Sequence, residues 1–453
     1  MYNTIGSMVE NLARTKEKIM EVIRKELCAG VGLTAIRTGK FKSGTLSVNF
    51  LAPLSEETAA RNALVPHVLR RGCETLPTMA QVSARLEELY GSILEPVVRR
   101  RGETQCVGLY GSFLDDAYTL DEGGNLEAAG HLLAQLILHP VTEKGVFCAE
   151  YVRGEKENLI QAIRSEMNEK WQYAVHRLTQ EMCRGERYGV PRCGTEKDVA
   201  EITPETLWAQ YGALLRSTPV EIHYCGTATC ERVEAALREL TDGLQAARRQ
   251  AGQMKKPVCA VVAHRPVPEV RRVTERLDVA QGKLALGFRT GGVTVREKEF
   301  PALTLLNAIY GGTSNSKLFM NVRERLSLCY HVSSTAEQVK GVLVVSSGVE
   351  FGKMDEAQGE ILAQLDAIKA GKITEEELRQ AKQTLISSYR SLLDSRNALE
   401  SYWLSAAVTG QDTPPEERLE RLRNVTQEDV TAVAQGIELD TVYRLVGKEA
   451  GHD

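Results

Sequence analysis

The sequence lacks the long apolar runs and the charge excess that mark membrane proteins and nucleic-acid-binding proteins. No stretch approaches the roughly 18 consecutive apolar residues of a membrane-spanning helix. Residues 1–26 also lack the apolar core of a signal peptide, and they predict an amphipathic helix instead. The net charge is −4 over 453 residues, which favours neither nucleic acid nor an anionic membrane as a partner. We therefore expect a cytoplasmic protein that binds neither of them.

Paired metal-binding and redox motifs are also missing. The ten cysteines include no Cys-x-x-Cys pair, and the eight histidines include no His-x-x-Glu-His. Scattered cysteines in a chain without an export signal are typical of reduced, buried thiols. The sequence therefore predicts no disulfide framework.

The order of the expected elements occurs twice along the chain. Each half reads as strands, a pair of helices, further strands, several helices and one closing strand. In the first half, strands over 30–39 and 44–54 predict a hairpin. A chain of 453 residues exceeds one ordinary hydrophobic core. We expect an N-terminal domain over 1–244, a basic linker over 245–268 and a C-terminal domain over 269–453.

Grouped strands followed by grouped helices indicate an α+β fold. In such a fold each half is a mainly antiparallel sheet, and its helices pack on one face. The duplication then predicts two such halves in one chain.

The segment "RNALVPHVLRRGC", residues 61–73, resembles a zinc-peptidase helix without its chemistry. In an inverted zinc motif, His-x-x-Glu-His directs two imidazoles and a carboxylate from one helix face. Ala63, Pro66 and His67 occupy those three positions here. Alanine cannot ligate zinc, and proline can neither accept a proton nor donate a helical hydrogen bond.

Three longer segments carry a resemblance to a known family. They are "NALVPHVLRRGCETLPTMAQVSARLEELYGS", "YVRGEKENLIQAIRSEM" and "LNAIYGGTSNSKLFMNVRERLSLCYHVSS". Together they resemble the insulinase/pitrilysin (M16) peptidase superfamily, and the likeness covers essentially the whole chain. The phrases "RTGKFKSGTLSV" and "RLEELYGS" are further similar to the group associated with 5-aminopentanol modification of elongation factor P. The resemblance implies the M16/LuxS-like metalloenzyme fold with its two halves arranged as a clamshell.

The resemblance also implies which zinc-site residues are missing. The first histidine falls on Ala63, the catalytic glutamate on Pro66 and the second histidine on His67. Glu155 matches a functional glutamate of the family, and Ala162 takes the place of the third zinc ligand. A slip of one helical turn in this alignment would recruit the neighbouring carboxylates Glu157 or Glu166 instead. We expect no bound zinc, a packed structural His67, and a solvated or salt-bridged Glu155.

The C-terminal half keeps more of the family pattern. Arg323 and Tyr330 match an Arg/Tyr pair that binds the substrate backbone and stabilises the reacting carbonyl. A guanidinium and a phenol hydroxyl are suitable donors for that role. Gly311 and Gly312 belong to a loop that either contacts peptide or simply joins two helices; glycine there permits a positive φ or a close backbone approach. The resemblance also implies a substrate-binding edge strand, for which 44–54 is the candidate.

These observations lead to a ranked set of functional hypotheses. The first is a non-catalytic, bacterial M16-type subunit that binds peptide and complements a zinc-bearing M16 paralogue in a heterodimer. Zinc would then reside only in the partner subunit. The second is a peptide-binding or scaffold protein without peptidase activity, and the third is an autonomous zinc peptidase with a displaced site. A homodimer is expected when the natural partner is absent.

Overall fold

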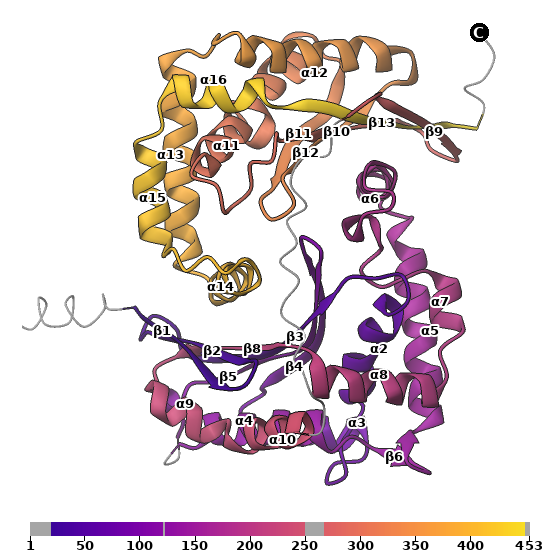
Figure 1. Ribbon diagram of the computed structural model, residues 1–453, viewed down its shortest axis with the longest axis vertical. Coiled ribbons are helices and arrows are strands. Elements are labelled where there is room, and N and C mark those ends of the chain that lie inside the picture. The colour runs from indigo at the N-terminus through magenta and orange to yellow at the C-terminus, as the bar shows by residue number, and fades with distance from the viewer. Residues whose placement is uncertain (1–19, 121–122, 250–266, 449–453) are drawn as a thin grey trace, which may run out of the picture. The chain divides into compact units, whose positions relative to one another are not determined.

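The computed structural model describes residues 20–120, 123–249 and 267–448 (Figure 1). Contacts between Cα atoms divide the chain into two compact units. Unit 1 comprises 1–161, 192–258 and 394–408, and unit 2 comprises 162–191, 259–393 and 409–453. Each unit therefore contains a segment from the other half of the sequence, which a division into consecutive domains does not capture.

Unit 1 is built on a six-stranded sheet with the order β1-β2-β8-β3-β5-β4. All neighbouring strands are antiparallel except β2 and β8, which are parallel. The strands are β1 (Glu21–Cys28), β2 (Val31–Arg37), β3 (Ser43–Pro53), β4 (Ile93–Arg101), β5 (Thr104–Leu114) and β8 (Val220–Gly226). β6 (Thr142–Glu143) and β7 (Val146–Phe147) form a separate two-stranded hairpin.

Most helices of unit 1 lie on one face of this sheet (Figure 1). They are α2 (Ala59–Leu69), α3 (Met79–Glu88), η1 (Asp116–Tyr118), α4 (Asn125–Leu138), α5 (Ala149–Glu166), α7 (Glu196–Ala200), α8 (Pro204–Ser217), α9 (Cys230–Ala236) and α10 (Arg238–Arg249). Threonine begins several of them: Thr203, for example, accepts a hydrogen bond from the backbone N–H of Thr206, which satisfies a free helical donor.

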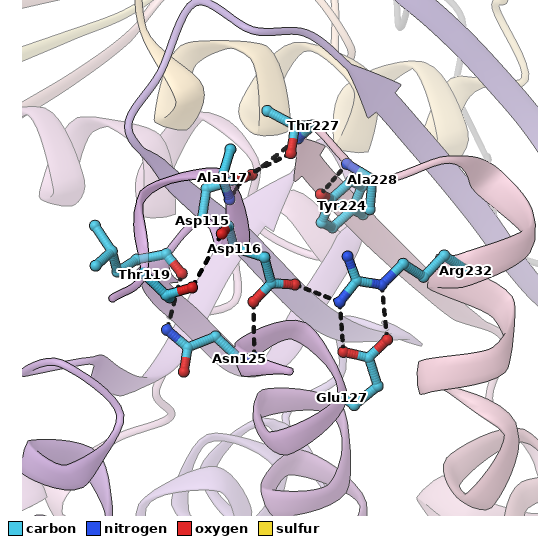
Figure 2. Close-up of polar contacts among 11 residues, drawn as sticks. Asp115, Asp116, Ala117, Thr119, Asn125, Glu127, Tyr224, Thr227, Ala228 and Arg232 are labelled. Carbon is cyan, nitrogen blue, oxygen red and sulfur yellow. Dashed lines mark hydrogen bonds and ion pairs between the residues drawn. The ribbon is translucent and has the colours of Figure 1, made fainter. Parts of the chain in front are cut away.

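A polar cluster joins two connections at one end of this sheet (Figure 2). Asp115 follows β5 and accepts hydrogen bonds from the backbone N–H groups of Ala117 at 3.1 Å and Thr227 at 2.9 Å. Arg232 on α9 forms ion pairs with Asp116 and Glu127. Because Asp115 links the residues after β5 to Thr227 and Arg232 links α9 to Asp116 and Glu127, the cluster fixes the β5–α4 and β8–α9 connections.

Unit 2 contains a five-stranded sheet with the order β11-β12-β10-β13-β9. Its strands are β9 (Arg271–Leu277), β10 (Gly282–Arg289), β11 (Cys329–Glu337), β12 (Val342–Val349) and β13 (Glu438–Gly447). The pair β13–β9 is parallel and the other pairs are antiparallel. This order repeats β4-β5-β3-β8-β2 of unit 1, so β11 corresponds to the edge strand β4. The expected duplication and α+β architecture are confirmed.

Helices of unit 2 also gather on one face of their sheet (Figure 1). They are α11 (Phe300–Asn307), α12 (Met354–Lys369), α13 (Glu375–Leu392), α15 (Pro415–Arg423) and α16 (Gln427–Gln435), with the shorter segments η2 (Arg187–Gly189), η3 (Ala308–Gly312), η4 (Phe319–Arg325) and η5 (Phe351–Lys353). Leu284, Leu286 and Phe288 alternate along β10 and belong to the core under these helices.

The opposite face of each sheet carries a helix from the other half of the sequence. In Figure 1 the gold helix α14 (Arg396–Thr409) lies against the unit 1 sheet, and the magenta helix α6 (Lys170–Met182) lies against the unit 2 sheet. The buried Glu400 of α14 accepts a hydrogen bond from Ser47 Oγ of β3 at 3.0 Å. On α6, Ala174 and Leu178 pack on the face of the unit 2 sheet formed by β10 and β13.

Several expectations about the first half are wrong. β2 and β3 form no hairpin, because the fully buried strand β8 lies between them. For the same reason 44–54 is no edge: β3 is paired with β8 and β5 along most of its length. Residues 1–19 of the expected N-terminal helix lie outside the described residues, and 21–26 belong to strand β1.

The remaining sequence predictions have mixed outcomes. Residues 245–249 of the expected linker continue helix α10, and 250–266 lie outside the described residues. The domain boundaries themselves stay a prediction. All nine cysteines in the described ranges are free thiols. None of the helices in those ranges has the length and apolar character needed to cross a membrane.

Candidate functional site

Helix α2 of unit 1 holds Ala63, Pro66 and His67, the three positions that the family resemblance matches to a zinc motif. Ala63 and Pro66 are buried, and His67 is partly exposed. The helix continues through Pro66, whose carbonyl oxygen accepts a hydrogen bond from the backbone N–H of Arg70 at 3.1 Å. Proline at this position removes one backbone hydrogen-bond donor. One turn earlier, the buried Asn62 donates a hydrogen bond to Gln105 and accepts one from Gln210. α2 is therefore a packed structural helix.

His67 lies near one carboxylate, that of Glu155 on α5. Burial lowers the pKa of His67 below its usual value, while the negative charge of Glu155 partly opposes that shift. Glu155 itself is buried, with 8% of its surface exposed. Its Oε1 atom lies 3.1 Å from Nη1 of Arg71, and its Oε2 atom accepts a hydrogen bond from Asn158 at 3.2 Å. The carboxylate is thus held in a salt bridge.

The other residues aligned with the third ligand do not add to this group. Ala162 is an exposed residue of α5, two helical turns after Glu155. Glu157 is exposed on the same helix. Glu166 lies 3.5 Å from His176 Nδ1, so this carboxylate has a partner of its own.

Zinc would need three protein ligands and an open position for water. The donor set at α2 consists of one imidazole and one carboxylate already paired with a guanidinium. Over the residues that the structure describes, no cluster of three or more His, Cys, Asp or Glu side chains is arranged to hold a metal ion. The residues at α2 therefore do not fit a catalytic zinc.

Arg323 and Tyr330 of unit 2 lie where the chain passes from η4 into the edge strand β11. The guanidinium of Arg323 packs over the Phe319 ring at 4.6 Å from its centroid, and it lies 3.5 Å from Glu324. Tyr330 sits at a β-bulge between Cys329 and His331, and 73% of its surface is exposed. A bulge re-aims a side chain away from the regular pleat, so Tyr330 can meet a ligand at the edge of the sheet.

Gly311 and Gly312 contribute through packing and not through an unusual backbone conformation. Neither has a positive φ. A Cβ atom on Gly311 would lie 2.8 Å from the backbone nitrogen of Ser334 on β11, and one on Gly312 would lie 2.9 Å from the carbonyl oxygen of Asn307. Gly311 therefore lets η3 lie directly against β11, the strand that carries Tyr330, whereas Gly312 allows a close approach to Asn307 at the end of α11.

Two further side chains at this edge were missed by the reading of the sequence. Trp171 of α6 donates a hydrogen bond from Nε1 to Ser346 Oγ at 2.9 Å. Its ring meets the ring of His331 edge-on, with centroids 5.8 Å apart. Trp171 and His331 are 160 positions apart in sequence, so no local sequence pattern could pair them.

Comparisons with known proteins agree with this geometry. Residues 201–385 match the family model described as "Peptidase M16 inactive domain". A Bacillus subtilis (strain 168) protein named "Probable inactive metalloprotease YmfF" is 33% identical over 420 residues, which cover 92% of this chain and 96% of that protein.

Solved structures share the fold over nearly the full length. A conserved protein from Enterococcus faecalis V583 has a TM-score of 0.84 at 29% identity, covering 95% of this chain and 100% of that chain. A peptidase M16 inactive domain from Pseudomonas fluorescens has a TM-score of 0.75 at 16% identity, covering 96% of this chain and 100% of that one, and supports the fold alone. This chain belongs to the M16 peptidase family, as an inactive homologue.

Proposed function

We propose that this chain is a non-catalytic M16-type subunit that binds an extended peptide and supplies Arg323 and Tyr330 to a zinc-bearing partner subunit. The observation that carries the proposal is the contrast between its two candidate sites. At α2 the donor set does not fit a metal, whereas Tyr330 on β11 is 73% exposed and Arg323, on the segment η4 that leads into this strand, is also exposed. The narrower relation to elongation factor P modification stays a prediction.

The edge strands of the two sheets differ in how well they are protected against pairing. Natural sheets protect their edges with charges and proline. β1 (EVIRKELC) and β9 (RRVTERL) carry several charges, and β4 (ILEPVVRRR) carries four charges and Pro96. β11 (CYHVSSTAE) has a single charged residue, at its end. β11 is therefore the edge most suited to pairing with an added peptide strand.

The chemistry of the Arg/Tyr pair fits a supporting role in peptide hydrolysis. The Arg323 guanidinium carries several N–H groups and can donate to a peptide carbonyl oxygen. The Tyr330 hydroxyl can donate to the oxyanion that develops when water attacks that carbonyl. Both groups hold and polarise the substrate, and the attacking water would be activated in the partner.

Co-expression tests this proposal. The chain is produced together with an M16 relative that has an intact His-x-x-Glu-His, and cleavage of unfolded peptides is followed. Arg323→Ala and Tyr330→Phe should each lower kcat roughly 10- to 1000-fold while assembly persists. Arg325→Ala is the matched control: it lies on the same segment, is exposed, and pairs with Glu360. Full activity of both variants would refute the assigned residues.

A second candidate function is a peptide-binding scaffold with no peptidase partner. It is favoured by the β11 edge, whose exposed side chains belong entirely to unit 2 of this chain. If the purified chain binds peptides but assembles with no zinc-bearing relative, the scaffold function replaces the subunit function. Size-exclusion chromatography of the isolated chain would show whether it forms the expected homodimer.

A further inference from the structure

Trp171 is an exposed aromatic side chain that is nevertheless held rigidly. It lies in the first turn of α6, and 40% of its surface is exposed. The hydrogen bond to Ser346 of β12 fixes one side of the indole, and the edge-on contact with His331 of β11, at an interplanar angle of 82°, fixes its orientation. A ring that is already ordered loses little conformational entropy when a ligand binds to it.

The strand register shows what surrounds this ring. His331, Gly348 and Lys283 form one row across β11, β12 and β10, and Ser333, Ser346 and Ala285 form the next row on the same face. α6 covers the β10 end of these rows, where Ala174 and Leu178 pack with Ala285. At the β11 end, His331 remains exposed and Ser333 partly exposed.

The two charges that shift the pKa of His331 are positive, and one of them, Arg323, also lies 3.5 Å from the Glu324 carboxylate. Burial lowers the pKa of His331, and the cations Arg323 and Lys283 lower it further. Lys283 donates to Gln281 at 2.8 Å, and the Arg323 side chain is 43% exposed. His331 is therefore neutral at pH 7, so its ring offers an uncharged face beside two cations.

We propose that Trp171 and His331 form a subsite for an aromatic side chain of an anionic peptide that pairs with β11. This proposal deepens the proposed function, because it rests on peptide binding at the same edge. Side chains of a strand alternate between faces, so every second residue of a peptide paired with β11 points to the face that carries Trp171. An aromatic ring there gains edge or offset contacts with the indole, and carboxylates on the peptide are attracted by Arg323 and Lys283.

Direct binding to the purified full chain tests the subsite. The probes are dye-labelled Ser/Thr-rich peptides that differ in the central residue (Phe, Leu or Ala) and in the flanking residues (Glu or Lys). Fluorescence anisotropy gives each Kd. We expect the Phe peptide with Glu flanks to bind roughly three- to tenfold more tightly than its Ala counterpart. The preference for Glu over Lys should shrink as salt is added.

Variants at Trp171 separate a subsite from a general effect on folding. Trp171→Leu should remove the preference for Phe over Ala and leave the Kd of the Ala peptide unchanged. Trp171→Phe should keep most of the preference, because an aromatic ring remains. Trp208→Phe is the matched control, since Trp208 is a tryptophan of unit 1 that packs on Phe147.

The possible outcomes distinguish this proposal from the proposed function. Equal Kd values for Phe, Leu and Ala peptides, or a Phe preference that survives Trp171→Leu, would overturn the aromatic subsite. Equal binding of Glu and Lys peptides would overturn its anionic preference. No binding of any peptide would overturn both proposals. A Trp171-dependent preference without assembly on a zinc-bearing relative would support the subsite and overturn only the subunit function.

Discussion

Arg71 Nη1 lies 3.1 Å from Oε1 of Glu155, so the carboxylate beside His67 is already neutralised by a cation of the same unit. The family resemblance predicts that Glu155 occupies the position of a functional glutamate. Here it is a buried member of an ion pair that joins α5 to Arg71, in the turn just after the end of α2. The ion pair gives this carboxylate a structural role that requires no catalytic one.

The purified chain should contain no stoichiometric zinc. A zinc ion would find one imidazole and one paired carboxylate at α2, which is below the three protein ligands of a catalytic site. Elemental analysis after dialysis against zinc measures this, and a relative with an intact His-x-x-Glu-His is the positive control. One tightly held zinc per chain that disappears in His67→Ala would contradict the prediction.

Breaking the Arg71–Glu155 pair should destabilise unit 1. Arg71→Met leaves a largely buried carboxylate that keeps the hydrogen bond from Asn158 but loses its cation, and should lower the free energy of unfolding by about 1–3 kcal/mol. Glu155→Gln combined with Arg71→Met should cost little further unfolding free energy, because the unpaired carboxylate charge is then gone. Chemical denaturation of the single and double variants measures the coupling; additive losses would mean that the two side chains act independently.

Gly311→Ala should destabilise unit 2 and disturb β11. The added methyl would lie 2.7 Å from Leu318 Cδ1 and 2.8 Å from Ser334, and overpacking of this kind costs about 1–3 kcal/mol. Gly359→Ala is the control: its Cβ would meet nothing within 4 Å, and alanine in helix α12 should stabilise by about 0.5–1 kcal/mol. Thermal unfolding of the two variants should shift Tm in opposite directions, and equal shifts would refute this packing role.

A buried ion cluster should make unit 2 sensitive to acid. Glu186 lies 2.8 Å from Arg289 and 2.6 Å from Lys340, and all three side chains are buried. Burial raises the pKa of Glu186, but hydrogen bonds from Arg289 and Lys340 outweigh it and hold the pKa below the usual value of 4.5. The unfolded state therefore takes up the proton first. This stabilisation is fully present above about pH 4.5 and is lost as the pH falls through the folded pKa.

The variant Glu186→Gln tests the same cluster at neutral pH. It removes the carboxylate shared by Arg289 and Lys340, of which Arg289 keeps Asp440 at 2.8 Å, and should cost about 3–5 kcal/mol of unfolding free energy. The difference between wild type and variant should shrink as the pH falls below 4.5. Glu376→Gln is the control, because Glu376 forms an exposed pair with Arg379 and its loss should change little. A gap between wild type and Glu186→Gln that is constant with pH would contradict the assignment.

Local pattern was sufficient for part of this structure. Alternation along β3 and the Thr203 capping box are readable in sequence because each depends on residues a few positions apart. Ala63 and Pro66 likewise exclude a working zinc motif from their side-chain chemistry alone, whatever the helix packs against. Local patterns could not place β8 between β2 and β3, because strand order depends on pairing between segments that are far apart in sequence.

Long-range contacts account for the rest. The pattern of 374–410 predicts one long helix, but the helix breaks after Leu392 into α13 and α14. α14 packs on strands far earlier in the chain: Glu400 and Arg99, which are in contact, are 301 positions apart. Trp171 and His331 meet only because α6 lies on the unit 2 sheet. Their contact depends on tertiary packing, which no single stretch of sequence encodes.

The exchange of α6 and α14 has a consequence for how the protein is made. Unit 1 contains most of the first 258 residues, yet it includes 394–408, and the buried partner of Ser47 is Glu400. During synthesis, the ribosome must therefore release nearly the whole chain before unit 1 can close its second face. Expression of the first half alone should give a protein with an uncovered sheet, and the two halves should recover their fold only when they are produced together.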